Sequence, residues 1–217
     1  PYPLTWFLNL NSLSFLRQRA VDQDFYPVTD MIVWTVDNDH IPRGHYHLQA
    51  ESIGTTIIGA TVDSEKLYNQ ICALDDNQPL IKRPYREDDI SLHTQRLPCD
   101  TDLGSGLGVA STGHLNELKS SQYRHTAWQI FTPQWIIGLL PCDDHRYHYV
   151  LSSSKVIEFP EDALSKLFKQ FSIPLSAKPL SYFGPKQISS FHRKHYRYKQ
   201  SLLLGDALHQ VHPLAGQ

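Results

Sequence analysis

The chain has 217 residues, of which 41% are hydrophobic, so it can bury a core as one large domain or two small ones. A formal net charge of −2 gives no sign of a polyanionic partner, and nucleic acid is not expected. Its three cysteines, Cys72, Cys99 and Cys142, contain no C-x-x-C pair, which favours reduced cytosolic thiols over a disulfide framework or a zinc site.

Four elements are predicted in the first third of the chain from apolar periodicity and β-branched composition. In chain order they are a helix from about Asn11, a strand at Met31–Val36, a strand at Thr55–Val62 and a helix after Ser64. Asn11 or Ser12 is expected to cap the first helix, and Gly59 to interrupt the second strand. Residues 37–39 are predicted to form a turn.

Residues 75–121 give a weaker signal, because prolines, charges and glycines are scattered through them. Loops are expected here, with short strands as the open alternative. The cluster Gly104-Ser105-Gly106-Leu107-Gly108 follows no apolar strand, and a flexible loop is favoured over a dinucleotide-binding site.

Order returns in the second half with a predicted strand pair, Trp128–Leu140 and Arg146–Ser152, joined across a Pro-Cys-Asp-Asp turn. A helix is predicted after Pro160. Its apolar stripe consists of Leu164, Leu167, Phe168 and Phe171. Further strands are predicted at Ser181–Ser189 and Leu202–Leu204. This order suits a mixed α/β protein.

The last sixteen residues run from a short apolar strand into Gly205-Asp206-Ala207 and then His-Pro-Leu-Ala-Gly-Gln. An apolar strand of this kind is typical of a buried parallel sheet, where ligands sit beyond the carboxyl ends of the strands. Gly205 lets the backbone approach a ligand closely, and Asp206 can accept hydrogen bonds from sugar or ribityl hydroxyls. On the Gly-Asp pair alone, an ordinary turn with an exposed Asp is the favoured interpretation.

The longer pattern Gly-Asp-Ala-x-His-x-x-His-Pro-x-Ala-Gly-Gln resembles the second flavin-contacting segment of the FAD-dependent aromatic hydroxylases, most closely the ubiquinone-biosynthesis branch. Leu208 departs from the Ala usual in that family. The resemblance implies a mixed α+β fold, in which a partial FAD/NAD(P)-binding domain joins a sheet-based substrate domain as in the para-hydroxybenzoate-hydroxylase-like fold. Trp128 to Pro141 is similar to the family's strand pair on the ring side of the flavin.

The resemblance also implies which residues bind FAD. Gly205 and Asp206 would hold the ribityl-phosphate side, and the final loop would pass beside the isoalloxazine ring. The implied cofactor-binding set is Gly205, Asp206, Ala207, Pro213, Leu214, Ala215, Gly216 and Gln217. His209 and His212 are interpreted as shaping the loop. No catalytic residue and no metal ligand is assigned.

Three regions are expected: 1–75 with elements of both domains, 76–190 as a substrate domain with a mostly antiparallel sheet, and 191–217 returning to the FAD domain. The family's G-x-G-x-x-G and middle Asp-Gly segments have no counterpart here. Either this is a piece of a longer chain, or it is a degenerate homologue.

By resemblance the activity is hydroxylation of the aromatic ring of a polyprenyl phenol in ubiquinone biosynthesis, through a flavin C4a-hydroperoxide, with O2 and NAD(P)H or another reductant. Other ubiquinone-biosynthesis proteins are implied as partners. A cytoplasmic location is implied, with docking at the inner-membrane surface. The alternatives are a non-catalytic fragment or accessory homologue that binds partner proteins or lipid, and a flavin hydroxylase of another phenol.

Two weaker groupings remain. His45 and His47 share one face of a strand and could chelate a metal together with His40, Asp37 or Asp39, but surface polar roles are favoured. The basic, aromatic stretch 191–199 could meet phosphates, headgroups or an acidic partner, and a structural connector is the favoured interpretation.

Overall fold

The structure is a computed structural model that describes residues 4–21, 24–77, 91–93, 106–117, 123–189, 191–193, 195–198, 201–203 and 208–210. The helices are α1 (Leu10–Arg17), α2 (Ser64–Asn77), α3 (Glu161–Gln170) and the short 3-10 helix η1 (Ala50–Ile53). None of the helices in these residues is long and apolar enough to cross a membrane. Together with the strands they confirm the predicted mixed α+β class.

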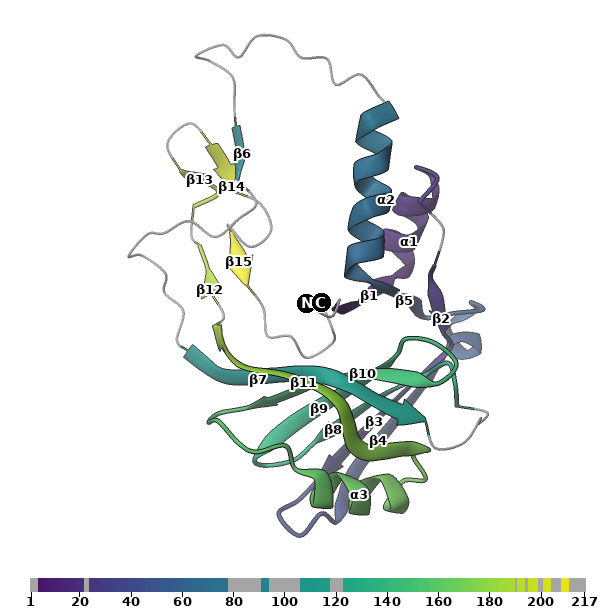
Figure 1. Cartoon of the computed structure of the whole chain (residues 1–217), viewed down its shortest axis with the longest axis vertical. Coiled ribbons are helices and arrows are strands. Elements are labelled where there is room, and N and C mark those ends of the chain that lie inside the picture. The colour runs from purple at the N-terminus through teal and green to yellow at the C-terminus, as the bar shows by residue number, and fades with distance from the viewer. Residues whose placement is uncertain are drawn as a thin grey trace.

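One large sheet forms the lower layer of the molecule (Figure 1). Its strands are β3 (Asp30–Val36), β4 (Pro42–Gln49), β7 (Gly106–Glu117), β8 (Thr126–Phe131), β9 (Trp135–Pro141), β10 (Arg146–Ser153) and β11 (Leu175–Ser189). The order is β11-β7-β10-β9-β8-β3-β4. Neighbours run antiparallel except β3 and β8, which are parallel. The predicted strands at Met31–Val36 and Ser181–Ser189, and the pairing of β9 with β10, are confirmed.

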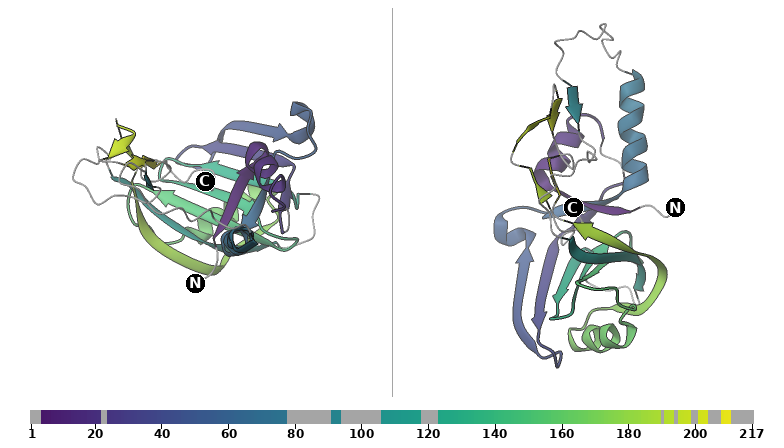
Figure 2. Two further views of the ribbon diagram at one scale, coloured as in Figure 1. Left: turned by 90° about the horizontal axis from the view of Figure 1, so that it is seen from above. Right: turned by 90° about the vertical axis from the view of Figure 1, so that its left-hand side faces the viewer.

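Helix α3 covers the lower face of this sheet, as Figures 1 and 2 show. The predicted stripe is confirmed, because Leu164, Leu167 and Phe168 are buried and belong to the main core with alternate residues of β8, β9 and β10. Phe171 follows the helix and stacks on Trp34 of β3 at 4.2 Å between ring centroids. Two acidic residues in the first turn of α3 favour its N-terminus electrostatically.

A second layer lies on the opposite face of the sheet (Figure 2). It consists of the antiparallel strands β1 (Thr5–Asn9), β5 (Gly59–Asp63) and β2 (Tyr26–Val28), with α1 and α2 beyond them. Val28 and Ile58 of this layer are buried against Ala127 of β8 and Leu140 of β9. This apolar contact joins the two layers.

A third group of short strands lies beside the second layer (Figure 1). These are β6 (Ser91–His93), β12 (Phe191–His192), β13 (Arg197–Tyr198), β14 (Ser201–Leu203) and β15 (His209–Gln210). β14 pairs in parallel with β6, as predicted for the strand before the Gly-Asp segment, and antiparallel with β13. β12 pairs with β15.

Several predicted boundaries are wrong, and local hydrogen bonds explain why. α1 begins earlier than expected, because the side chain of Asn9 accepts a hydrogen bond from the Ser12 amide at 2.9 Å and acts as the cap. Asp63 caps α2 in the same way through the amides of Glu65 and Lys66, at 2.9 and 3.0 Å, so Ser64 is already helical. Residues 55–58 are irregular, and the strand begins at Gly59.

The expected loop between 75 and 121 is wrong at Gly106–Glu117, which forms the long interior strand β7 beside the edge strand β11. Its glycines suggested a loop, yet Gly113 is needed for close approach. A Cβ there would lie 2.0 Å from the carbonyl oxygen of Ser181 on β11 and 2.7 Å from the Tyr149 hydroxyl on β10. A glycine inside a strand can therefore report close backbone contact instead of a loop.

Candidate functional site

The strand register divides the seven-stranded sheet into two faces. Side chains directly opposite one another share a face, and neighbours along a strand alternate. His148 of β10 lies opposite His114 of β7 and Leu140 of β9. Because Leu140 packs against the second layer, both histidines belong to the face turned toward that layer.

The same register shows which residues of the strand pair predicted to lie beside a flavin belong to each face of the sheet. Antiparallel pairing of Trp128 with Leu139 confirms this pair as β8 and β9. Four of its residues are buried in the core under α3: Trp128, Ile130, Ile137 and Leu139. The alternating positions on the opposite face are Gln129, Phe131, Ile136 and Gly138. This second set lies, with Ala127 and Leu140, on the face turned toward the second layer.

Two imidazoles lie side by side on the face toward the second layer. His148 is 2% exposed, and its ring lies edge-on to His114 with 5.3 Å between the centroids. His114 is anchored, because its amide donates to Ser181 Oγ and its Nδ1 lies 3.1 Å from the same oxygen. His148 Nδ1 is buried and has no hydrogen-bond partner in the part of the chain that the structure describes.

Both histidines are neutral imidazoles at neutral pH. The pKa of His148 is lowered to about 4. Burial is the larger cause, and the neighbouring His114 adds to it. Burial also lowers the pKa of His114, followed by Arg146, whereas Asp143 and Asp63 act in the opposite direction. A neutral imidazole can donate one hydrogen bond and accept another. This face of the sheet therefore carries uncharged groups that can act both as donor and as acceptor.

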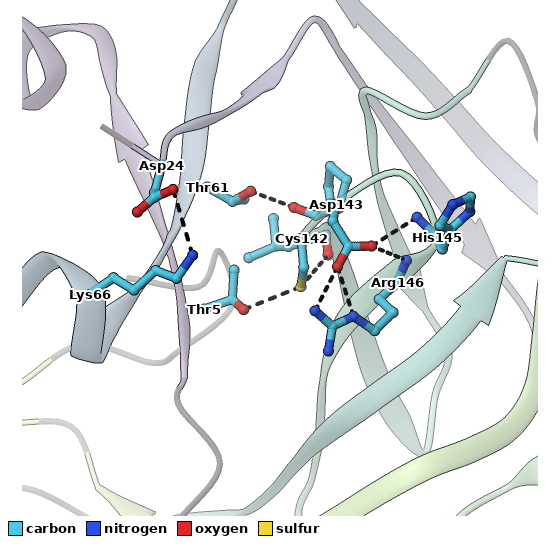
Figure 3. A network of polar contacts seen from close by, with 10 residues as sticks. Thr5, Asp24, Thr61, Lys66, Cys142, Asp143, His145 and Arg146 are labelled. Carbon is cyan, nitrogen blue, oxygen red and sulfur yellow. Dashed lines mark hydrogen bonds and ion pairs between the residues drawn. The ribbon is translucent and has the colours of Figure 1, made fainter. Parts of the chain in front are cut away.

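A polar junction fixes the second layer over this face (Figure 3). The Thr61 hydroxyl of β5 donates to the carbonyl of Pro141, and Thr5 Oγ1 of β1 lies 3.2 Å from Cys142 Sγ. Asp143 holds the turn between β9 and β10 by accepting from the amides of His145 and Arg146, each at 2.8 Å.

Within this junction, burial raises the pKa of the Cys142 thiol to about 11. It is therefore a protonated structural contact and no nucleophile. It is a free thiol, as expected of the reduced set, while the side chains of Cys72 and Cys99 lie outside the described residues.

The predicted cofactor-binding residues Gly205, Asp206, Ala207 and Pro213–Gln217 all lie outside the described residues, as does His212. The strand that leads to them fits the prediction. β14 runs parallel to β6, and Leu203 is buried at its carboxyl end. Ligands of parallel sheets bind beyond this end of a strand, so the Gly-Asp segment follows a suitable support for FAD.

The weaker groupings have structural roles. The ring of His45 lies tilted against that of Trp34 with 4.2 Å between the centroids, and His47 Nε2 lies 2.7 Å from Asp30 Oδ1. Asp37 accepts hydrogen bonds from Arg43 and two backbone amides. No group of three possible metal ligands is found among the residues described. In the basic stretch 191–199, the described residues include the connecting strands β12 and β13.

The sequence interpretation missed the histidine pair. A signal for His148 was present, because it alternates with Tyr147 and Tyr149 in a predicted strand and must point away from them. His114 gave none, because β7 was not predicted. Only the register brings the two together.

No protein-family model matches this sequence, and no curated protein matches it either. The structure does resemble solved structures. It matches 2-methyl-3-hydroxypyridine-5-carboxylic acid oxygenase with a TM-score of 0.64 and 11% identity, over 100% of this chain and 68% of that one. It matches p-nitrophenol 4-monooxygenase PnpA from Pseudomonas putida DLL-E4 with a TM-score of 0.60 and 12% identity, over 100% and 65%.

Klebsiella pneumoniae HpxO, solved with FAD and uric acid, matches with a TM-score of 0.61 and 12% identity, over 98% of this chain and 66% of HpxO. The chain thus spans about two thirds of the length of these proteins. At such low identity the likeness shows the fold. The chain has the para-hydroxybenzoate-hydroxylase-like fold of these proteins.

Proposed function

We propose that this chain belongs to an FAD-dependent aromatic-ring monooxygenase and that its substrate is a polyprenyl phenol of ubiquinone biosynthesis. One observation carries the proposal: a chain that ends in the flavin-contacting pattern Gly-Asp-Ala…His-Pro-Leu-Ala-Gly-Gln has the fold of PnpA and of FAD-bound HpxO.

The protein's part in this reaction is to bind, orient and exclude water. Gly205, Asp206 and Ala207 would hold the ribityl-phosphate side of FAD, and Pro213–Gln217 would border its ring. When bound, FAD supplies the chemistry that activates O2 for transfer to the aromatic ring, with reducing equivalents from NAD(P)H or another donor. The sheet face that carries His148 would receive the substrate.

The choice of a polyprenyl phenol rests on two features. The His-Pro-Leu-Ala-Gly-Gln run resembles the ubiquinone branch of the hydroxylases. The proposed substrate face also combines neutral imidazoles with apolar positions such as Ile136 and Val150, which suits an uncharged ring with an apolar substituent. Docking at a membrane surface, where such a substrate resides, is part of the same proposal. A flavin hydroxylase of another phenol would share these features.

A non-catalytic homologue that binds partner proteins or lipid is the second candidate. It is favoured by one observation: the stretch from Gln70 to Ala127 contains no counterpart of the family's middle Asp-Gly segment.

Absorbance spectra and FAD titration of the purified protein separate the two candidates. The enzyme proposal expects a yellow protein, or a colourless one that binds added FAD and quenches its fluorescence. Asp206→Ala should weaken FAD binding about tenfold or more, because a hydrogen-bonding carboxylate is lost. Asp162→Ala, at an exposed position on α3, is the matched control and should leave FAD affinity unchanged. A wild-type protein that refuses FAD would favour the non-catalytic homologue.

A further inference from the structure

We propose that His148 positions the substrate by a hydrogen bond between its Nδ1 and a phenolic hydroxyl, and that the His114–His148 face selects neutral phenols over aromatic carboxylates. The proposal rests on the proposed function, which it deepens by naming the residue that meets the substrate. His148 acts as a positioning residue.

The unpartnered nitrogen is the first argument. His148 is 2% exposed, and its Nδ1 is one of six buried side-chain nitrogens for which the described residues show no hydrogen-bond partner. Unlike the indole nitrogens of Trp34 and Trp128 under α3, it lies on the proposed substrate face. Buried polar atoms are nearly always hydrogen-bonded, because desolvating one without a partner destabilises the fold. A buried imidazole that keeps a free nitrogen on the proposed substrate face is therefore suited to a ligand.

The position of His148 between the sheet and the second layer also suits a bound ligand. His148 lies between Leu140 and His114, on the face that the second layer covers. Thr61 and Thr5 tie that layer to the β9–β10 turn only a few residues from His148 (Figure 3). A ligand hydroxyl at Nδ1 would be shielded from water, which strengthens a hydrogen bond and sharpens orientation.

The neutral charge state of the two histidines favours a phenol over a carboxylate as the ligand. Both imidazoles are neutral at neutral pH, and a neutral imidazole matches a hydroxyl, which also donates and accepts. A carboxylate needs a cation. Arg146 is the cation that acts on His114, and Asp143 Oδ2 already binds its Nε and Nη2, each at 2.7 Å.

Three probes with the same apolar tail test this selection: 4-propylphenol, 4-propylanisole and 4-propylbenzoate. Each is titrated into the FAD-free protein by calorimetry, and the histidine ring nitrogens are followed by 15N NMR. The phenol should bind and shift the His148 nitrogens. The anisole, which cannot donate, and the benzoate, which brings a charge, should each bind about tenfold more weakly or worse.

Paired variants test the residue. His148→Asn keeps an amide near the position of Nδ1 and should retain phenol affinity within about threefold, whereas His148→Leu should lose about tenfold or more. His145→Leu, at an exposed position in the nearby turn, is the control and should bind as wild type. His148→Leu should also raise the urea midpoint of unfolding, because it removes an unpaired buried polar atom. This stability gain shows that the variant is folded.

Three results overturn the inference: wild type that binds no probe, equal binding of phenol and anisole, or phenol binding unchanged in His148→Leu. Failure of FAD to bind leaves these measurements intact and contradicts the proposed function alone, so the two failures are distinguishable.

Discussion

The two faces of the seven-stranded sheet bury side chains of different kinds. Under α3, the buried residues are apolar or aromatic, and the tyrosine hydroxyls are paired: Tyr147 donates to the Tyr123 carbonyl at 2.8 Å and Tyr149 to the Ser181 carbonyl at 3.3 Å. On the face toward the second layer, His148 is as deeply buried but leaves Nδ1 unpaired. The face under α3 also buries Trp34 Nε1 and Trp128 Nε1 without partners among the described residues. An indole can only donate a hydrogen bond, whereas an imidazole can also accept one, so the two faces are separated by the kind of polar group that they bury.

The largest expected effect lies under α3. Leu167→Ala should lower the free energy of unfolding by about 4 kcal/mol, because Leu167 is fully buried and the change leaves a cavity. FAD and phenol affinities of the folded variant should equal those of wild type. Urea denaturation and calorimetry check both parts, with exposed Lys166→Ala as the control. A loss of ligand affinity in folded Leu167→Ala would break the separation of the faces.

Gly113→Ala should be nearly as damaging, with a loss of at least about 3 kcal/mol, because the new Cβ meets the Ser181 carbonyl at 2.0 Å and neither strand can yield. Gly44→Ala is the matched control on the exposed edge strand β4. Its Cβ would lie 3.5 Å from Thr35 Oγ1, an ordinary contact, so the change in unfolding free energy should stay within about 1 kcal/mol. Equal urea midpoints for the two variants would contradict the close approach of β11.

Acidification should destabilise the folded protein through the histidines on the face toward the second layer. The unfolded chain protonates His148 near its ordinary pKa of 6.5, whereas the folded protein does so only near 4. Between these values the unfolded state binds more protons, so stability falls as the pH drops from 6.5 to 4, by about 3 kcal/mol for this residue. Burial of His114 contributes in the same direction.

The pH effect is measured as the difference between wild type and His148→Leu, from urea midpoints at pH 7, 5 and 4. This difference cancels the contributions of Asp143, Asp63 and Arg146, which both proteins share. Parallel pH profiles for the two proteins would show that His148 is not buried as a neutral imidazole.

The smallest effect is expected at the exposed edge of the sheet. Burial alone would raise the pKa of Asp30, but hydrogen bonds from Thr29 and His47 outweigh it and lower that pKa. His47→Ala should nevertheless cost at most about 1 kcal/mol, because the pair is solvent-accessible. A larger loss in urea denaturation would mean that the edge strand contributes more than a surface ion pair.

Much of the architecture could be predicted from local pattern. The stripe of α3, the alternation in β10 and the turn between β9 and β10 follow from periods and turn residues within a few positions of one another. The prediction failed at β7, because Gly113 is required there by the close approach of Tyr149 and of β11, which lie far away in the chain. It also named Ser64 as the N-cap of α2 where the structure has Asp63, because the choice of cap depends on the geometry of the preceding strand.

The sequence by itself determined the mixed class, the apolar stripe and the flavin-like pattern from Gly205 to Gln217, because each is written in contiguous residues. Tertiary structure alone decided which side of the β8–β9 pair faces the second layer and which histidines meet. Both depend on register between strands that lie far apart in the chain, and a shift of one residue would exchange the two faces. Composition shows twelve histidines, and the register makes two of them neighbours.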